Sequence, residues 1–271
     1  MEPKVKFCLW AVLCPALCAG ADIAGPASLE EGYRQMYNLQ FDGAHRTFHQ
    51  WENAHPADPL GPASDAAAYL FSEFDRLHIL QSEFFAEDEN FLRIHKLTPD
   101  IAARNGFQAD LNAASQLAAS DPAGNPDTAF AQVLLHGLHS DYLALIEKRY
   151  IAALGETKLA RAAAEKVLAE RPDYYDANLA VGVENYLLSL KPAPIRLLLR
   201  VTGSETDKQA GIEKLRLTAE KGHYLAPFAK LLLAVAALRD KNRDAAREQL
   251  SWLVAHYPEN RLFQAELAKV Q

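Results

Sequence analysis

The stretch AREQLSWLVAHYPEN, from Ala246 to Asn260, predicts one amphipathic helix that ends at a proline. Two earlier stretches share this pattern: AHRTFHQWENAHPAD begins at Ala44, and ARAAAEKVLAERPDY begins at Ala160. In each copy an alanine stands twelve residues before the proline, and apolar residues stand eight and five residues before it. Because these offsets lie on one face of a helix, the chain repeats a helix with one buried face and a fixed stop.

Helical partners lie close to these copies. APFAKLLLAVAALRD, at 226–240, precedes the third copy, and YYDANLAVGVENYLLSL, at 174–190, follows the second. Gly155 and the pair Lys241-Asn242 are expected to form the turns before the second and third copies, and Gly182 to admit a neighbouring helix closely. The sequence therefore predicts helix, short turn, helix and proline, at a period of about 34 residues.

This pattern resembles the tetratricopeptide repeat (TPR) superfamily, with Ala160, Pro172, Gly182, Ala246 and Pro258 at its small-residue and proline positions. The segments GIEKLRLTAEKG and YPENRLF further resemble the Iml2 and tetratricopeptide-repeat-39 group. The resemblance implies an all-α fold, a right-handed stack of antiparallel helical hairpins, or TPR-like α-solenoid. In such a stack each hairpin is stabilised by its neighbours.

The three copies are unevenly spaced, so we expect one helical repeat domain over 22–271 with irregular insertions near 60–154 and 190–208. The pattern predicts further helices over 64–81, 99–119, 128–154, 195–201 and 208–221, with a terminal helix over 259–270. The sequence Ser204-x-x-Asp207 is a capping signal for the helix that begins at Lys208, and Gly222 is expected at its C-cap.

The first 21 residues, MEPKVKFCLWAVLCPALCAGA, predict a secretory signal peptide that is cleaved after Ala21. Its apolar run is shorter than the roughly 20 residues that a bilayer span needs, so no membrane span is expected in the mature chain. All three cysteines lie in this segment, which leaves the mature chain without a disulfide or a thiolate metal site. The alternative is a lipoprotein acylated at Cys18. We expect export to the bacterial periplasm or cell envelope.

Composition and the absence of known motifs argue against several functions. The net charge of −7 and the pI near 5.7 argue against nucleic-acid binding, which needs a basic surface. The nucleotide-binding, HExxH and GxSxG motifs are all absent from the sequence. We therefore expect a protein that is not an enzyme and needs no cofactor.

Histidines and carboxylates offer the other candidate chemistry. His45 and His49 have the i, i+4 spacing that can chelate a metal, but Ala44 and Phe48 take the buried face, so the sequence favours a half-exposed helix flank. His136, His139 and Asp141, in HGLHSD, are candidate metal ligands, although a packed or solvated pair is the simpler interpretation. The acidic run at 87–89 is expected to be a solvated loop or helix start.

The favoured function is protein–protein interaction. TPR-like stacks bind a peptide or helix along a concave groove, so we expect a non-catalytic scaffold that holds a protein or peptide partner. The alternative is a small-molecule- or metal-binding helical module that uses clustered histidine and aspartate residues. The residues expected to line the groove are Tyr175, Asp176, Asn178, Leu179, Val183, Tyr186, Phe228 and Arg239.

Overall fold

The computed structural model describes residues 28–79, 97–121, 125–190 and 207–271. These residues form eleven α-helices and no strand, which confirms the expected all-helical class. Consecutive helices pack against each other from one end of the chain to the other. The helices are α1 (Leu29–Tyr37), α2 (Phe41–Ala54), α3 (Leu60–Arg76), α6 (Ile101–Ser120), α7 (Pro126–Asp141), α8 (Tyr150–Glu170), α9 (Asn178–Ser189), α11 (Lys208–Lys221), α12 (Ala226–Arg239), α13 (Arg243–His256) and α14 (Arg261–Lys269).

The three predicted copies are the helices α2, α8 and α13, and each ends two residues before its proline. Their C-cap residues, His55, Arg171 and Tyr257, have nearly the same non-helical conformation, with φ of −132°, −133° and −128° and ψ of 64°, 83° and 65°. A following proline disfavours the helical conformation, because its ring clashes with a helical residue before it. The repeat is therefore a repeat of backbone geometry as well as of sequence.

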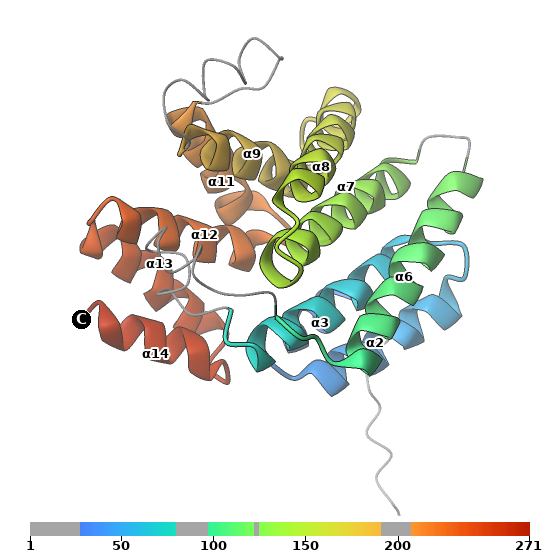
Figure 1. Cartoon of the computed structure of the whole chain (residues 1–271), viewed down its shortest axis with the longest axis horizontal. Helices are drawn as coiled ribbons and strands as arrows, with labels where there is room; N and C mark the ends of the chain where they lie inside the picture. The colour runs from blue at the N-terminus through green and yellow to red at the C-terminus, as the bar shows by residue number, and fades with distance from the viewer. Residues whose placement is uncertain (1–27, 80–96, 122–124, 191–206) are drawn as a thin grey trace, which may run out of the picture.

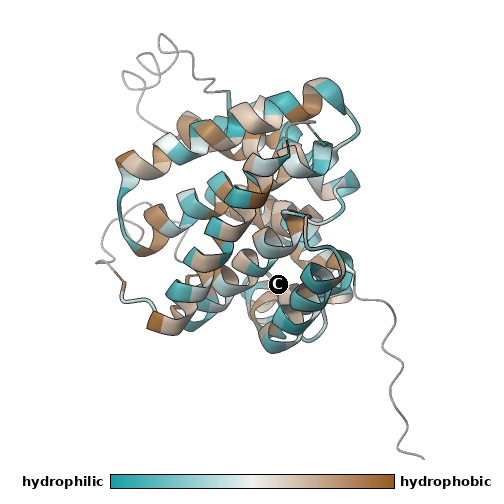
Figure 2. Cartoon of the chain, turned by 90° about the vertical axis from the view of Figure 1, so that its right-hand side faces the viewer, coloured by the Kyte–Doolittle hydropathy of each residue, from teal (hydrophilic) through white to brown (hydrophobic). Residues whose placement is uncertain are grey.

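Eight of the nine predicted positions are buried, and the ninth, Trp51 of α2, is partly buried. The alanine at the first offset is buried in every copy, with exposed fractions of 0% for Ala44, 3% for Ala160 and 0% for Ala246. Gly182 lies where α9 crosses α11, and a Cβ added there would lie 3.0 Å from the Gly211 carbonyl oxygen. Figure 2 shows that most helices carry both apolar and polar residues, as helices with one buried face should.

The expected helix over 128–154 and the turn at Gly155 are wrong. The chain leaves α7 at Asp141, makes one π-helical turn (Tyr142–Ile146) and starts α8 at Tyr150. The break lies at Lys148, which has a positive φ of 59° and whose side chain gives no turn signal. Gly155 lies inside α8, and a Cβ there would meet no atom within 4 Å.

Other boundaries differ less. The helix expected over 64–81 is α3, which starts earlier because the Asp58 carboxylate accepts a hydrogen bond from the Leu60 N–H at 2.9 Å. The helix at 208–221 is α11; Asp207 is its N-cap and Gly222 its C-cap, as expected. The signal segment, the acidic run at 87–89 and the short helix at 195–201 lie outside the described residues.

The two ends of the helical series meet. Figure 1 shows the helices following an arc that brings α14 back beside α3, where Arg261 pairs with Asp75 at 2.7 Å. The Asn260 side-chain amide donates to the Tyr37 carbonyl oxygen at 2.7 Å. Tyr33 lies 5.1 Å from Tyr224, between ring centres. Aromatic side chains of α1 and α3 therefore pack against the C-terminal helices.

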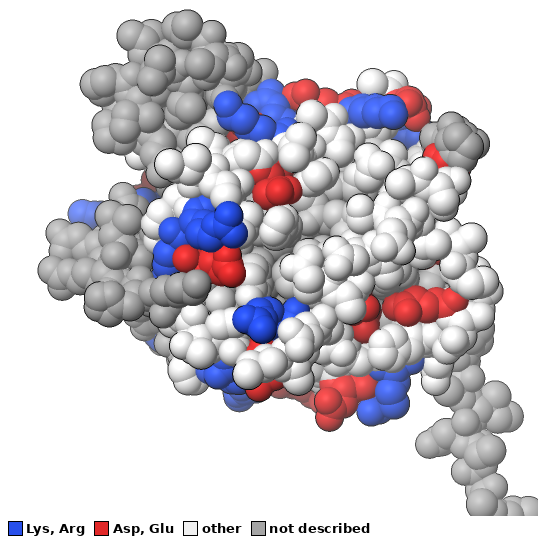
Figure 3. All heavy atoms as spheres, turned by 45° about the vertical axis from the view of Figure 1, so that its right-hand side comes forward, with Lys and Arg blue, Asp and Glu red and all other residues white. Residues whose placement is uncertain are grey.

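The surface has no strongly charged region on the face in Figure 3, where acidic and basic side chains lie in small mixed groups around a broad uncharged area. Among the described residues, no helix is both long and apolar enough to cross a bilayer.

Candidate functional site

Three of the residues predicted to line a groove are buried instead: Asp176, Asn178 and Tyr186 are 2%, 1% and 7% exposed. Both carboxylate oxygens of Asp176 accept backbone hydrogen bonds, from the N–H groups of His223, Tyr224 and Leu225 at 2.8, 3.2 and 2.8 Å. Asp176 thus holds the loop between α11 and α12.

The other predicted groove residues are divided between core and surface. Phe228 packs on Phe71 of α3, with ring centres 5.5 Å apart. The Tyr175 ring lies 5.0 Å from the Lys221 ammonium. The remaining three are partly buried: Leu179, Val183 and Arg239. The structure therefore places most of this set against other helices.

The histidine pair on α7 meets a carboxylate that the sequence analysis did not identify. The Nδ1 atoms of His136 and His139 lie 2.7 and 3.2 Å from the two oxygens of Glu156 on α8. Asp141 makes no hydrogen bond or ion pair with either histidine among the described residues. Of the three candidate ligands, His136 and His139 therefore share a contact with Glu156, and Asp141 does not take part in it.

Asp141 is the last residue of α7, where burial raises the pKa of its carboxyl group to about 7. The unfolded chain loses this proton near pH 3.8 but the folded chain keeps it to about pH 7, so stability falls as pH rises through this window. The full shift corresponds to about 4 kcal/mol, which solvent screening of a partly exposed group reduces to about 1–2 kcal/mol.

We therefore predict that Asp141→Asn stabilises the protein by about 1–2 kcal/mol at pH 8, with a smaller gain at pH 5. Urea unfolding at the two pH values measures the difference. An equal gain at both values would show that the carboxyl group is not buried as a neutral acid.

A denser cluster lies between α2 and α3. Asp65, in the first turns of α3, is fully buried, with 0% of its side chain exposed. Its two oxygens face two histidines of α2: His45 Nδ1 lies 2.5 Å from Oδ1, and His49 Nε2 lies 2.9 Å from Oδ2. His45 is 19% exposed and His49 is 55% exposed. Both histidines thus contact the same buried carboxylate.

Glu52 adds a second carboxylate one helical turn beyond His49. One ligand atom each from His49, Glu52 and Asp65 lies within 4.8 Å of the others, and no other group of three such residues does so in the described parts of the chain. Gly61 makes room for Glu52, because a Cβ on Gly61 would lie 2.6 Å from its Cγ. We call these three residues, with His45, the α2–α3 cluster.

One oxygen of each carboxylate in the cluster lacks a hydrogen-bond donor. Glu52 Oε1 and Asp65 Oδ2 are buried and accept no hydrogen bond in the described structure, although His49 Nε2 lies 2.9 Å from Asp65 Oδ2. Burial raises the pKa of Glu52, the charge of Asp65 raises it further, and His49 opposes both. Buried acceptors without donors are costly in a folded protein, so this cluster favours a bound cation.

No family model, curated protein or solved structure matches the chain. The function is therefore inferred from the chemistry of the site itself.

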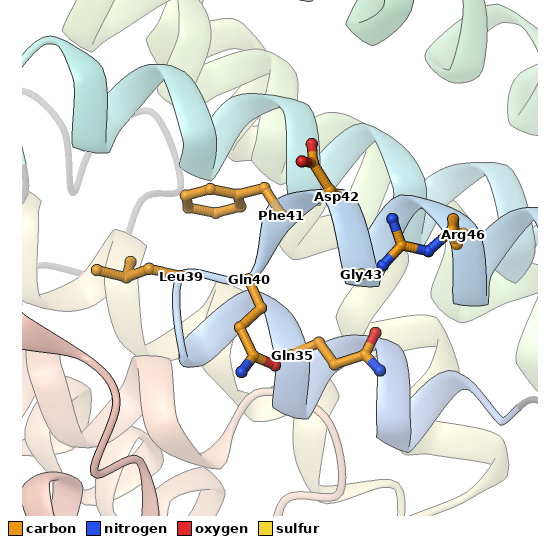
Figure 4. Close-up of a pocket in the computed structure, with 7 residues that line it drawn as sticks. All are labelled: Gln35, Leu39, Gln40, Phe41, Asp42, Gly43 and Arg46. Carbon is orange, nitrogen blue, oxygen red and sulfur yellow. The ribbon is translucent and has the colours of Figure 1, made fainter. Parts of the chain in front are cut away.

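A surface depression near α2 has different chemistry. It lies at the α1–α2 turn (Figure 4), and its lining residues are Gln35, Leu39, Gln40, Phe41, Asp42, Gly43 and Arg46. Gln35 already accepts a hydrogen bond from Thr47 at 2.9 Å, and Gln40 donates to Glu259. Of the described residues that line it, none is a histidine or a cysteine, so the α2–α3 cluster is the better candidate.

The sequence predicted that His45 and His49 lie on a half-exposed helix flank. This is correct for His49, but the prediction did not include Asp65, the buried carboxylate that both histidines contact. Asp65 stands between small residues in GPASDAAAYL, a charged residue in an otherwise buried run. That isolated charge was the available signal, because a carboxylate is rarely buried without a partner.

Proposed function

We propose that this protein binds a divalent transition-metal ion in the α2–α3 cluster. The observation that carries the proposal is the convergence of His49, Glu52 and Asp65 within 4.8 Å around a fully buried carboxylate. An ion there would supply the positive charge that the two carboxylates lack.

The mixture of ligand atoms indicates the class of ion. Imidazole nitrogen suits zinc, iron, cobalt and nickel, whereas magnesium and calcium prefer sites made entirely of oxygen. Metal-binding sites also commonly include an imidazole–carboxylate hydrogen bond beside the ligands. His45, which faces the other oxygen of Asp65 at 2.5 Å, fits that supporting position and would orient the Asp65 carboxylate.

The test is a thermal-unfolding titration of the metal-free protein with zinc, cobalt, magnesium and calcium. An ion at 100 times its Kd stabilises the folded state by about 2.7 kcal/mol, which corresponds to a rise in Tm of about 5–10 °C for a chain of this size. We expect this rise with zinc and cobalt and none with magnesium or calcium at the same concentration. No rise with any of the four, together with no binding heat, would refute the proposal.

A second candidate is partner binding by a right-handed helical-repeat stack, as the TPR resemblance implies. It is favoured by an apolar stripe on α8, where Ile151 and Leu159 are 92% and 50% exposed and Gly155 faces open space between them. A glycine on an exposed helix face lets another helix approach closely. Photo-crosslinking from position 151 in a bacterial envelope fraction should give a discrete adduct that crosslinking from the exposed Lys166 does not. Equal adducts from both positions would count against this surface.

A further inference from the structure

A cleft lies in the C-terminal part of the chain, far in the sequence from the α2–α3 cluster. It is found where α12 lies between α11 and α13 (Figure 1), and its lining residues come from these three helices and the turn after α12. We call it the α12 cleft. Its volume of about 360 Å³ is within the range of small-molecule sites.

Apolar side chains from all three helices line the α12 cleft. They include Ala236 and Ala237 of α12, Ile212 of α11 and Ala245 of α13. Ala236 is buried, and the other three are partly buried. Because the methyl groups of alanine leave space between neighbouring helices, the cleft can remove the apolar body of a ligand from water.

Packing holds α11, one wall of the cleft, in place. On α11, Gly211 approaches α9 so closely that a Cβ there would lie 2.7 Å from the Tyr186 backbone nitrogen. The Lys208 ammonium pairs with the Asp240 carboxylate and so connects the start of α11 to the end of α12. Contacts with α9 and α12 therefore fix this wall, and the cleft is formed before a ligand enters.

The charged side chains of the cleft do not balance. Lys208, Arg216 and Asp240 line it, which gives two positive charges and one negative charge. Lys208 is paired with Asp240. Arg216 lies eight residues further along α11, roughly 12 Å along the helix axis, and forms no hydrogen bond or ion pair with any residue that the structure describes. One guanidinium group therefore remains for an anion.

We propose that the α12 cleft binds an amphiphilic monocarboxylate such as a medium-chain fatty acid. A guanidinium group matches a carboxylate with two parallel hydrogen bonds, so the ligand carboxylate pairs with Arg216. The alkyl chain lies against Ile212, Ala236 and Ala237. The single negative charge of the ligand complements the net positive charge of the cleft. This site is independent of the proposed metal site, because it uses no residue of α2 or α3.

Calorimetric titration of the full chain with decanoate, below the concentration at which it forms micelles, tests the site. One decanoate should bind per chain. Decanol has the same alkyl chain without the charge, and decyltrimethylammonium has the opposite charge, so both should bind at least about tenfold more weakly. Arg216→Gln, an exposed change, should weaken decanoate binding about tenfold or more. Ala237→Leu fills the cleft and should abolish binding, with circular dichroism to check folding.

The control is Lys214→Gln, which removes the same charge from the same helix at a residue that does not line the cleft. It should leave the affinity for decanoate unchanged. If the wild type binds no decanoate, if decanol binds as tightly as decanoate, or if Arg216→Gln binds like the wild type, the proposal is wrong. Zinc binding in the α2–α3 cluster is measured separately and would survive any of these results.

Discussion

Asp65→Asn is expected to abolish the rise in Tm that zinc produces and to weaken zinc binding by more than about 100-fold, or about 2.7 kcal/mol. Asp65 is fully buried, and its two oxygens lie 2.5 and 2.9 Å from the nitrogens of His45 and His49. Asparagine has nearly the same shape but one oxygen and no charge, so the change removes the ligand while the fold is preserved. Calorimetric titration with zinc, with circular dichroism to check folding, measures the loss.

The chain contains a matched control for this experiment. Glu156 contacts His136 and His139 much as Asp65 contacts His45 and His49. Glu156 is 22% exposed, however, and the ligand atoms of Glu156, His136 and His139 do not all lie within 4.8 Å of one another. Glu156→Gln should therefore leave the strongest zinc affinity unchanged. If Glu156→Gln reduced that affinity and Asp65→Asn did not, the metal would lie between α7 and α8, and the assignment to α2 and α3 would be wrong.

The local repeat was predictable because it depends on residues that act within one helix. An alanine, two further apolar residues and a proline at fixed offsets define a buried face and a stop. These positions are buried in α8 and α13 and, apart from the partly buried Trp51, in α2. The break between α7 and α8 was not predictable in the same way. Lys148 has a positive φ, although it is neither glycine nor asparagine, the residues that usually adopt this conformation. The tertiary structure therefore imposes a backbone conformation that the residue type does not predict.

The site was only half predictable. The spacing of His45 and His49 gave the correct helix face, but their partner Asp65 comes from α3. Its approach depends on how α2 and α3 pack, which single-helix periodicity does not encode. The burial of Phe228, one of the expected groove residues, was not predictable for a related reason: it packs on Phe71 of α3, a helix far from it in the sequence.

Asp176→Ala is expected to destabilise the protein by about 3–5 kcal/mol. The alanine would leave the N–H groups of His223, Tyr224 and Leu225 without their acceptor inside the structure. Gly222 adds to the sensitivity of this loop, because it approaches so closely that a Cβ there would lie 2.8 Å from Asp176 Oδ1. For a chain of this size the Tm should fall by about 10 °C, measured by thermal unfolding of the metal-free protein.

Two further variants separate the hydrogen bonds from the charge. Burial raises the pKa of Asp176, although the three N–H groups oppose this, so the carboxylate is itself costly to bury. Asp176→Asn keeps one acceptor oxygen and removes that cost, and should therefore lose clearly less stability than Asp176→Ala. Asp173→Ala, an exposed change in the same connection, should have little effect. If Asp176→Ala were as stable as the wild type, the carboxylate would not be needed for folding, and its predicted role in partner contact would regain support.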